Sequence, residues 1–218
     1  MKFWHGVIAG ALVVFLAACG GNTPSGSTTP QSSNSSSAAP ASTPTTTPPP
    51  DVNSELLTTS DLPGWSTENS SDSGEPKCLD SVRSALRTAS KAEAAFVDGS
   101  SGLPSLEESL AYVPGQGQSD MTVVSRILAG CGPVKLTTAG QIVSGTVSKM
   151  SFPGVADQSS AYKMNLSGTF SGVQETLGVD IVVFRKADTV AMILFGNLGS
   201  PNRRALHRIV QDAAAKLS

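Results

Sequence analysis

The sequence predicts a single α+β domain, in which N-terminal helices and one C-terminal helix pack on an antiparallel sheet. Two observations predict this class. Apolar residues recur at helical spacing in residues 78–90, in residues 120–132 and after residue 201, whereas residues 162–196 show the alternation or the apolar runs of strands. Because these strands follow one another without intervening helices, they favour an antiparallel meander.

Residues 1–18 have the features of a signal peptide. Lys2 supplies a positive charge, and the apolar stretch at 7–18 is shorter than the roughly 20 residues of a membrane-spanning helix. Residues 16–19, Leu-Ala-Ala-Cys, resemble a bacterial lipobox, which implies that Cys19 is diacylated and becomes the first residue of the mature chain. The alternative is an ordinary signal peptide that leaves Cys19 as a free thiol.

Residues 19–50 are predicted to form a disordered Ser/Thr/Pro-rich tether behind the lipidated cysteine. From residue 20 onward this stretch has no Asp, Glu, Lys or Arg, so it cannot bury enough surface to offset the entropy of ordering. Residues 51–218 then have a length typical of one domain. The predicted location is the extracytoplasmic face of the cell membrane, to which the acyl chains would hold the protein.

Two cysteines remain in the predicted domain, Cys78 and Cys131. Thiols outside the cytoplasm tend to be oxidised, so we predict a disulfide between them, with two buried free thiols as the alternative. A loop of this length contributes about 4 kcal/mol to stability in the chain-entropy model. The chain has 17 acidic and 15 basic residues and no basic run, so its charge gives no support to nucleic-acid binding.

The first half of the domain is predicted to contain two helices and two strands. Segment 53–65 begins with a helix-like pattern and ends in an Asp-Leu-Pro-Gly turn. The first helix, over 78–90, follows a proline and has apolar residues on one face. Stretches 91–99 and 105–114 are short, mixed and bounded by Gly or Pro, which favours strands.

The second helix is predicted over residues 120–132, with Ser119 as its N-cap and Gly132 at its end. Its apolar face includes Val124, Leu128 and Cys131, which fall at helical spacing. This arrangement brings the end of the second helix to the first helix, where Cys78 lies.

The second half of the domain is predicted to be β structure up to residue 200 and then helical. Residues 162–170 alternate as in a half-buried strand, and residues 176–196 give two strands joined by a hairpin turn at 186–188. The second of these strands is apolar on both faces, which predicts a central place in the sheet. Ser200 as N-cap and Pro201 at the first helical position predict a C-terminal helix, whose buried stripe is Leu206, Ile209, Val210, Ala213 and Leu217.

No set of residues specifies a reaction, so we predict a protein that is not an enzyme and holds no cofactor or metal. His207 is the single histidine of the predicted mature chain, and a zinc site of nitrogen and sulfur ligands cannot be assembled. Ser160 and Lys163 match an S-x-x-K motif, but its companion motifs are missing, and residues three apart in a strand point to opposite faces. Ser171 lies in a sequence that resembles a serine-hydrolase elbow only loosely.

Four carboxylates are candidates for chemistry, and each has a structural explanation. Asp157 is expected in a turn, and Asp180 at an outward strand position. Glu107 and Glu108 are adjacent, so in a strand they lie on opposite faces, which argues against a paired acid and base.

The order of these parts resembles mycobacterial lipoproteins with a PknH-like extracellular sensor domain. The resemblance begins with the lipobox and stalk. Over residues 53–217 the motifs that carry it are LLTTSDLPGW, the two cysteine-bearing helices, PGVADQSSAY, DIVVFRKADTVAMILF and the terminal helix. The resemblance implies a disulfide-stapled α+β domain outside the membrane, with a cleft for an unidentified ligand and no catalysis. The receptor-kinase versions have two disulfides, whereas this domain has cysteines for one.

The leading hypothesis is a non-catalytic, membrane-anchored ligand-binding or sensor-like domain of the cell envelope. Its expected partners are the membrane, through the lipid anchor, and an unknown small molecule or envelope protein. The alternative is a lipid or glycolipid carrier, which requires a cavity lined by apolar side chains. Trp65, Tyr112 and Tyr162 are the candidate wall residues of a cleft, with core packing as the alternative role for each.

Overall fold

The computed structural model describes residues 49–69, 76–86, 90–99, 102–138, 141–170 and 173–218. The predicted signal peptide and tether, with Cys19, lie outside the described residues, and so does Ser171. The helices and strands are, in chain order, β1 (Trp65–Glu68), α1 (Lys77–Ala85), β2 (Ser90–Asp98), β3 (Ser105–Tyr112), α2 (Gly117–Ala129), β4 (Pro133–Thr138), β5 (Gln141–Met150), β6 (Gln158–Phe170), β7 (Val173–Lys186), β8 (Thr189–Leu198) and α3 (Arg203–Lys216).

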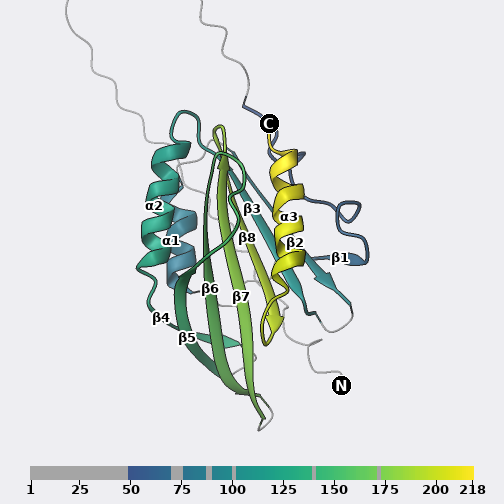
Figure 1. Cartoon of the computed structure of the whole chain (residues 1–218), viewed down its shortest axis with the longest axis vertical. Helices are drawn as coiled ribbons and strands as arrows, with labels where there is room; N and C mark the ends of the chain where they lie inside the picture. The colour runs from purple at the N-terminus through teal and green to yellow at the C-terminus, as the bar shows by residue number, and fades with distance from the viewer. Residues whose placement is uncertain (1–48, 70–75, 87–89, 100–101, 139–140, 171–172) are drawn as a thin grey trace, which may run out of the picture. The chain divides into compact units, whose positions relative to one another are not determined.

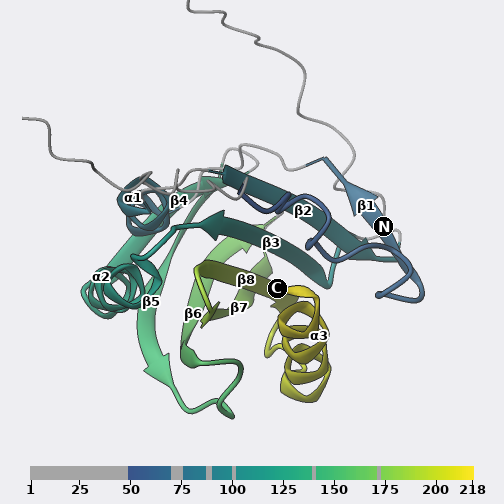
Figure 2. The ribbon, with the colours of Figure 1, turned by 90° about the horizontal axis from the view of Figure 1, so that it is seen from above.

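The strands form one antiparallel sheet in the order β1-β2-β3-β8-β7-β6-β5-β4. Helices α1 and α2 lie on one face of this sheet and α3 lies on the other, as Figure 1 shows. Figure 2, seen from above, shows the sheet curving between the two helical layers. The predicted α+β class, with an antiparallel sheet packed by N-terminal helices and a C-terminal helix, is confirmed.

Two apolar clusters hold these layers together, one on each face of the sheet. On the face covered by α1 and α2, the α1/α2 face, buried side chains of both helices pack on strands β4 to β8 and on β3. On the face covered by α3, the α3 face, the buried stripe of α3 packs on strands β2, β3, β7 and β8 and on residues 51–64. We refer to residues 51–64 as the N-terminal segment.

The helices form where apolar residues return to one side after each turn. In α1, Leu79 and Val82 are buried, and in α2 the buried positions include Met121, Val124 and Leu128. The predicted stripe of the C-terminal helix is also buried: Leu206, Ile209, Val210 and Ala213 lie in α3, and Leu217 is its C-cap residue.

Strands β6, β7 and β8 form the predicted meander. Strand β8 lies between β3 and β7 and is buried over most of its length, which confirms the central position predicted from its two apolar faces. The turn between β7 and β8 contains Ala187 with a φ of 48°, in the left-handed region. Asp157, which was expected in a turn, lies in the bend before β6, and its Oδ2 holds the β7–β8 turn by accepting a hydrogen bond of 2.8 Å from the Ala187 amide.

Three local predictions are wrong. Ser119 is not the N-cap of α2, because the helix begins at Gly117 after Gln116, and the Ser119 hydroxyl donates to the Gln116 carbonyl from within the first turn. Ser200 is not the N-cap of α3, because Asn202 takes that position. The N-terminal segment is a series of turns rather than helical, although the turn expected before Trp65 is present.

The predicted disulfide between Cys78 and Cys131 is present, with the two Cα atoms 5.5 Å apart. Cys78 lies in the first turn of α1, whereas Cys131 follows the end of α2 rather than lying within it, since α2 ends at Ala129. The bond therefore joins the start of one helix to the end of the other on the α1/α2 face.

Candidate functional site

A polar groove of about 440 Å³ opens on the α3 face, where strands β6 and β7 meet the start of α3. Strands β6 and β7 form its floor, and the loop before α3 forms one side. The lining residues are Lys163 and Asn165 on β6, Asp180 on β7, Ser200 and Pro201 in the loop, and Arg203 at the start of α3. We call this feature the α3 groove.

A glycine on β7 allows the loop before α3 to lie directly on the sheet. A Cβ atom at Gly178 would stand 2.3 Å from the Gly199 carbonyl oxygen and 2.7 Å from the Pro201 Cδ. The loop is fixed in this place by a 2.8 Å hydrogen bond from the Gly199 amide to the Thr176 carbonyl. Gly199 itself has a φ of +71°, which favours glycine.

Asp180 and Arg203 form an ion pair at the base of the groove. Arg203 Nε lies 3.4 Å from Asp180 Oδ2, and the side chain of Asp180 is 3% exposed whereas that of Arg203 is 56% exposed. Burial raises the pKa of Asp180, against the opposite effects of Arg203 and of Lys163. Asp180 was expected at an outward strand position; it is buried instead, because α3 and its preceding loop cover it.

A second cavity lies on the α1/α2 face and is smaller and apolar. Its volume is about 60 Å³, and it is lined mainly by apolar side chains of α1, α2, β3, β7 and β8. Sites for drug-sized ligands usually span roughly 300–1,000 Å³. This cavity has room for water-sized occupants only, so the α3 groove is the better candidate for a ligand site.

Glu107 and Glu108 lie on opposite faces of β3, as predicted. Glu107 forms an ion pair with Arg83 of α1. Glu108 is fully buried on the α3 face, where its Oε2 accepts a 2.7 Å hydrogen bond from the Leu57 amide of the N-terminal segment. Burial raises the pKa of Glu108 to about 7, and the hydrogen bond from Leu57 opposes this rise.

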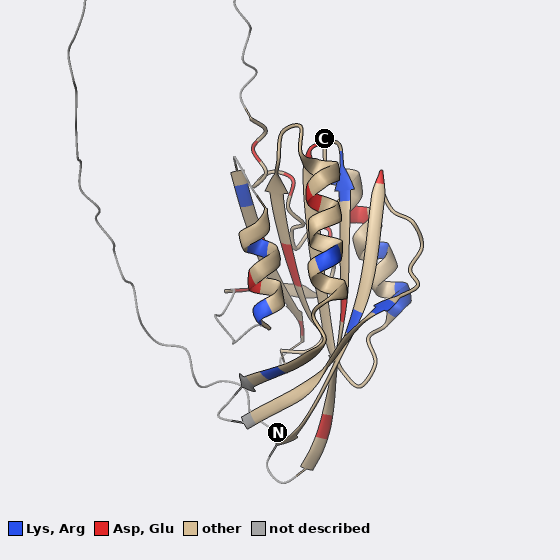
Figure 3. Cartoon of the chain, turned by 90° about the vertical axis from the view of Figure 1, so that its left-hand side faces the viewer, with Lys and Arg blue, Asp and Glu red and all other residues tan. Residues whose placement is uncertain are grey.

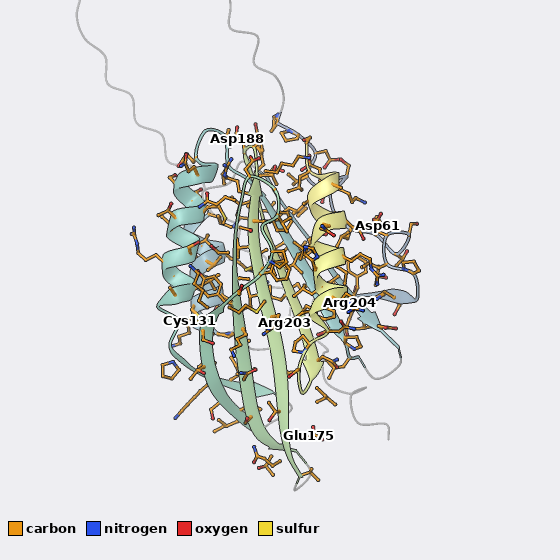
Figure 4. All side chains as sticks on the ribbon, viewed as in Figure 1. Asp61, Cys131, Glu175, Asp188, Arg203 and Arg204 are labelled. Carbon is orange, nitrogen blue, oxygen red and sulfur yellow. A yellow bond between two sulfur atoms is a disulfide. The ribbon has the colours of Figure 1, made fainter. Side chains whose placement is uncertain are left out.

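Two further carboxylates of the N-terminal segment contact the end of α3. Asp61 Oδ2 lies 2.8 Å from Lys216 Nζ, and this contact lowers the pKa of Asp61. Glu55 Oε1 accepts a 3.2 Å hydrogen bond from the Ser218 amide. Figure 4 labels Asp61 alongside α3 and Arg203 at its start, so the segment and the α3 groove lie at different ends of the same helix.

The three aromatic candidates for a cleft wall do not come together. Tyr162 is buried on the α1/α2 face, where its hydroxyl donates a 2.9 Å hydrogen bond to the Ser125 carbonyl of α2. Trp65 and Tyr112 are half-buried against the α3-face cluster, and Trp65 lies near Phe195 with ring centroids 6.1 Å apart. None of the three lines the α3 groove or the apolar cavity.

The other sequence candidates have structural partners. Ser160 accepts a 3.2 Å hydrogen bond from Ser125 of α2, and Lys163 projects from the other face of β6 into the α3 groove, so the two residues do not meet. His207 packs edge-on against Phe152, with ring centroids 5.6 Å apart. Within the described residues, His, Cys, Asp and Glu nowhere gather in threes as a metal site would require.

Charge is mixed over the described part of the chain. Figure 3 shows Lys and Arg interspersed with Asp and Glu along both the helices and the strands. A helix with the length and apolar character needed to cross a membrane is not found among the described residues.

The fold is similar to that of a solved extracellular domain. The extracellular domain of PknH from Mycobacterium tuberculosis matches with a TM-score of 0.53 at 10% sequence identity, over 75% of this chain and 94% of that domain. No protein-family model matches the chain, and no curated protein matches it in sequence. The structural likeness supports the PknH-like fold expected from the sequence, and at this identity it shows the fold alone.

Proposed function

We propose that this protein is a non-catalytic, sensor-like domain, held by a lipid anchor at the extracytoplasmic face of the membrane, that binds a small polar molecule in the α3 groove. The observation that carries the proposal is the groove itself, a polar hollow of about 440 Å³ with acidic, basic and neutral polar side chains around it. A few convergent polar groups in a concave site are the usual basis of ligand specificity.

The location in this proposal rests on the sequence. Residues 16–19 resemble a lipobox, and the uncharged stretch that follows separates it from the folded domain. Two disulfide-bonded cysteines in the domain fit an oxidising compartment. The likeness to an extracellular domain in fold is consistent with the same side of the membrane.

The cavities favour a polar ligand over the lipid of a carrier protein. A lipid carrier needs an apolar cavity of several hundred Å³, on the order of the ligand pockets of other proteins. The apolar cavity described above has about 60 Å³, whereas the larger hollow is polar and open. The cavities therefore support a sensor-like domain better than a lipid carrier.

A screen of polar envelope metabolites against the full chain, with thermal unfolding as the readout, tests the proposal. A ligand that binds the native state raises the unfolding temperature by mass action. We expect at least one compound to stabilise the wild type but not Asn165→Trp, in which the new ring fills the groove. Thr67→Trp, at an exposed position on edge strand β1, is the matched control and should respond as the wild type does.

Two outcomes would contradict the proposal. Stabilisation by a compound that is unchanged in Asn165→Trp would place the ligand elsewhere. Stoichiometric recovery of a lipid with the purified chain would support the carrier alternative.

A further inference from the structure

We propose that the α3 groove recognises its ligand through an anionic group, a carboxylate or a phosphate, held between Arg203 and Lys163. This inference rests on the proposed function and names the chemistry of the ligand in the same groove. It is carried by the charges around the groove, by the geometry of the Arg203–Asp180 pair and by the neutral donors beside them.

The charged side chains of the groove favour an anion. Two cationic side chains, Arg203 and Lys163, face it, and one carboxylate, Asp180, opposes them. Asp180 is 3% exposed on its side chain, so it lies beneath the groove, whereas Arg203 is 56% exposed and reaches its open part. A solute that enters the groove therefore meets the cations before the carboxylate.

The Arg203–Asp180 contact leaves the fork of the guanidinium available. Arg203 approaches Asp180 through Nε, and within the described residues its two terminal nitrogens have no protein partner. These nitrogens carry four of the five N–H donors of the guanidinium and match two oxygens of a carboxylate or phosphate. Asp180 thus acts as a positioning residue, because it fixes the side chain of Arg203 before a ligand arrives.

Lys163 is placed to complete the site. It lies opposite Asp180 in the pairing of β6 with β7, so its ammonium group is on the same face as the Arg203 guanidinium. Its charge interacts with that of Asp180, the residue opposite it on β7. Asn165 and Ser200 add neutral donors on either side.

A cationic ligand fits the groove less well. It would need Asp180, whose side chain is almost completely covered and already contacts Arg203. Such a ligand would have to displace Arg203 and enter next to Lys163, against the repulsion of two like charges.

The test uses amide NMR spectra of the isotope-labelled full chain in detergent. Four probes are titrated at constant ionic strength: inorganic phosphate, acetate, neutral glycerol and cationic ethanolamine. We expect saturable shifts at residues 163–165, 180 and 200–203 with phosphate, acetate or both, and comparison of these two anions tells which group the site prefers. Glycerol and ethanolamine should leave these amides unchanged at the same concentrations.

Three substitutions assign the site. Arg203→Gln should weaken anion binding about tenfold or more, as the loss of a charge-assisted pair of hydrogen bonds implies. Lys163→Gln should weaken anion binding severalfold. Because it leaves the Arg203–Asp180 pair intact, this variant tests the anion site even if Arg203→Gln does not fold. Arg204→Gln removes a charge of the same sign at the adjacent, exposed position of α3 and should bind as the wild type does.

Each contrary result has a distinct meaning. The inference is overturned if neither anion shifts the groove amides, or if Lys163→Gln and Arg204→Gln change the affinity equally. If glycerol or ethanolamine binds instead, the ligand class is wrong while the proposed function stands. If all four probes fail and the metabolite screen also finds no compound blocked by Asn165→Trp, the proposed function fails with it.

Discussion

Glu108 is a carboxyl group placed where a carboxylate is costly. It is fully buried in the interior strand β3, and its Oε1 has no hydrogen-bond partner within the described residues. Its other oxygen, Oε2, accepts a hydrogen bond from the Leu57 amide. Burial raises the pKa of Glu108 from 4.5 to about 7, so the group gains or loses its proton near neutral pH.

The pKa of Glu108 predicts how the stability of the domain changes with pH. Because the pKa is raised in the folded state, the stabilisation from the protonated group is complete below about pH 4.5 and is lost as the pH rises through about 7. Glu108→Gln keeps an oxygen for Leu57 but does not titrate. The variant should therefore become more stable relative to the wild type above pH 7, by at most about 3 kcal/mol, in urea denaturation at several pH values.

Glu175→Gln is the control for this comparison, since Glu175 is exposed on β7. It should leave the pH profile as it is. Asp61, whose pKa is lowered, contributes stability that is lost only as the pH falls through and below 3.8, outside this window. A pH profile that is the same in the wild type and in Glu108→Gln would show that Glu108 does not titrate between pH 4.5 and 8.

The sequence predicted one half of this arrangement. That Glu107 and Glu108 point to opposite faces follows from the period of a strand. That Glu108 is buried depends on Leu57, which is 51 residues away in the chain and meets it only after folding. A contact of this kind leaves no pattern in the local sequence.

At the level of elements, the start of α3 shows how tertiary packing overrides a local signal. Ser200-Pro201 is a good helix start by residue type. Instead, the approach of Gly199 and Pro201 to Gly178 holds this dipeptide on the sheet, and the helix begins only after Asn202. The close approach requires a glycine at position 178, because a Cβ atom there would clash with the loop. The sequence alone does not show this requirement, because it does not show that β7 and the loop are neighbours.

Substitutions at Ser200 and Asn202 distinguish the predicted N-cap of α3 from the observed one. The Asn202 side chain accepts hydrogen bonds of 3.2 Å from the amides of Arg204 and Ala205. Asn202→Ala should therefore lower the free energy of unfolding by about 1 kcal/mol, whereas Ser200→Ala should change it by only a few tenths. Urea denaturation measures both, and a larger loss in Ser200→Ala would contradict the cap seen in the structure.

The strands were more predictable than the caps. β8 carries apolar residues on both faces, and only a central strand with helices on either side buries both.

Helix α2 was predicted to reach Cys131, because that residue continues the apolar spacing, but the chain leaves the helix at Gly130. The disulfide is compatible with either end, so its pairing was predicted correctly although the helix boundary was not.

For the whole molecule, the N-terminal segment is part of the domain rather than a continuation of the predicted tether. Val52, Leu57 and Leu62 are buried in the α3-face cluster. The segment has little regular structure of its own, so contacts with β3 and α3 set its position. These contacts cannot be predicted from the residues of the segment alone, which is why a helix-like segment was predicted instead.

This integration predicts where the folding unit begins. A chain that starts at Pro49 should keep the stability of the full chain, whereas one that starts at Trp65 loses three buried apolar side chains and leaves Glu108 without Leu57. The chain that starts at Trp65 should have a free energy of unfolding lower by roughly 5 kcal/mol or more, from the usual contribution of burying three such side chains. Urea denaturation of the two truncated chains tests this, and equal stability would show that the segment is not part of the folding unit.

The α3 groove was the least predictable feature. Its side chains come from β6, β7, the loop before α3 and α3 itself. From the sequence, Asp180 and Lys163 were considered separately, as a strand carboxylate and as part of an S-x-x-K match, and were not brought together. The groove exists because β6 and β7 extend beside the start of α3, and that arrangement is a property of the fold. The aromatic residues chosen as candidates belong to the packing of both faces instead.

The contacts of the N-terminal segment also determine how a mechanical pull would enter the domain. Tension applied to the chain ahead of Asp51 acts first on the contacts of Glu55, Leu57 and Asp61, which lead to Ser218, to Glu108 and to Lys216. The force therefore reaches the end of α3 and the interior of the sheet before it reaches edge strand β1, although β1 comes next in the chain. Since the α3 groove lies at the other end of that helix, tension on the predicted tether and a ligand in the groove would act on opposite ends of α3.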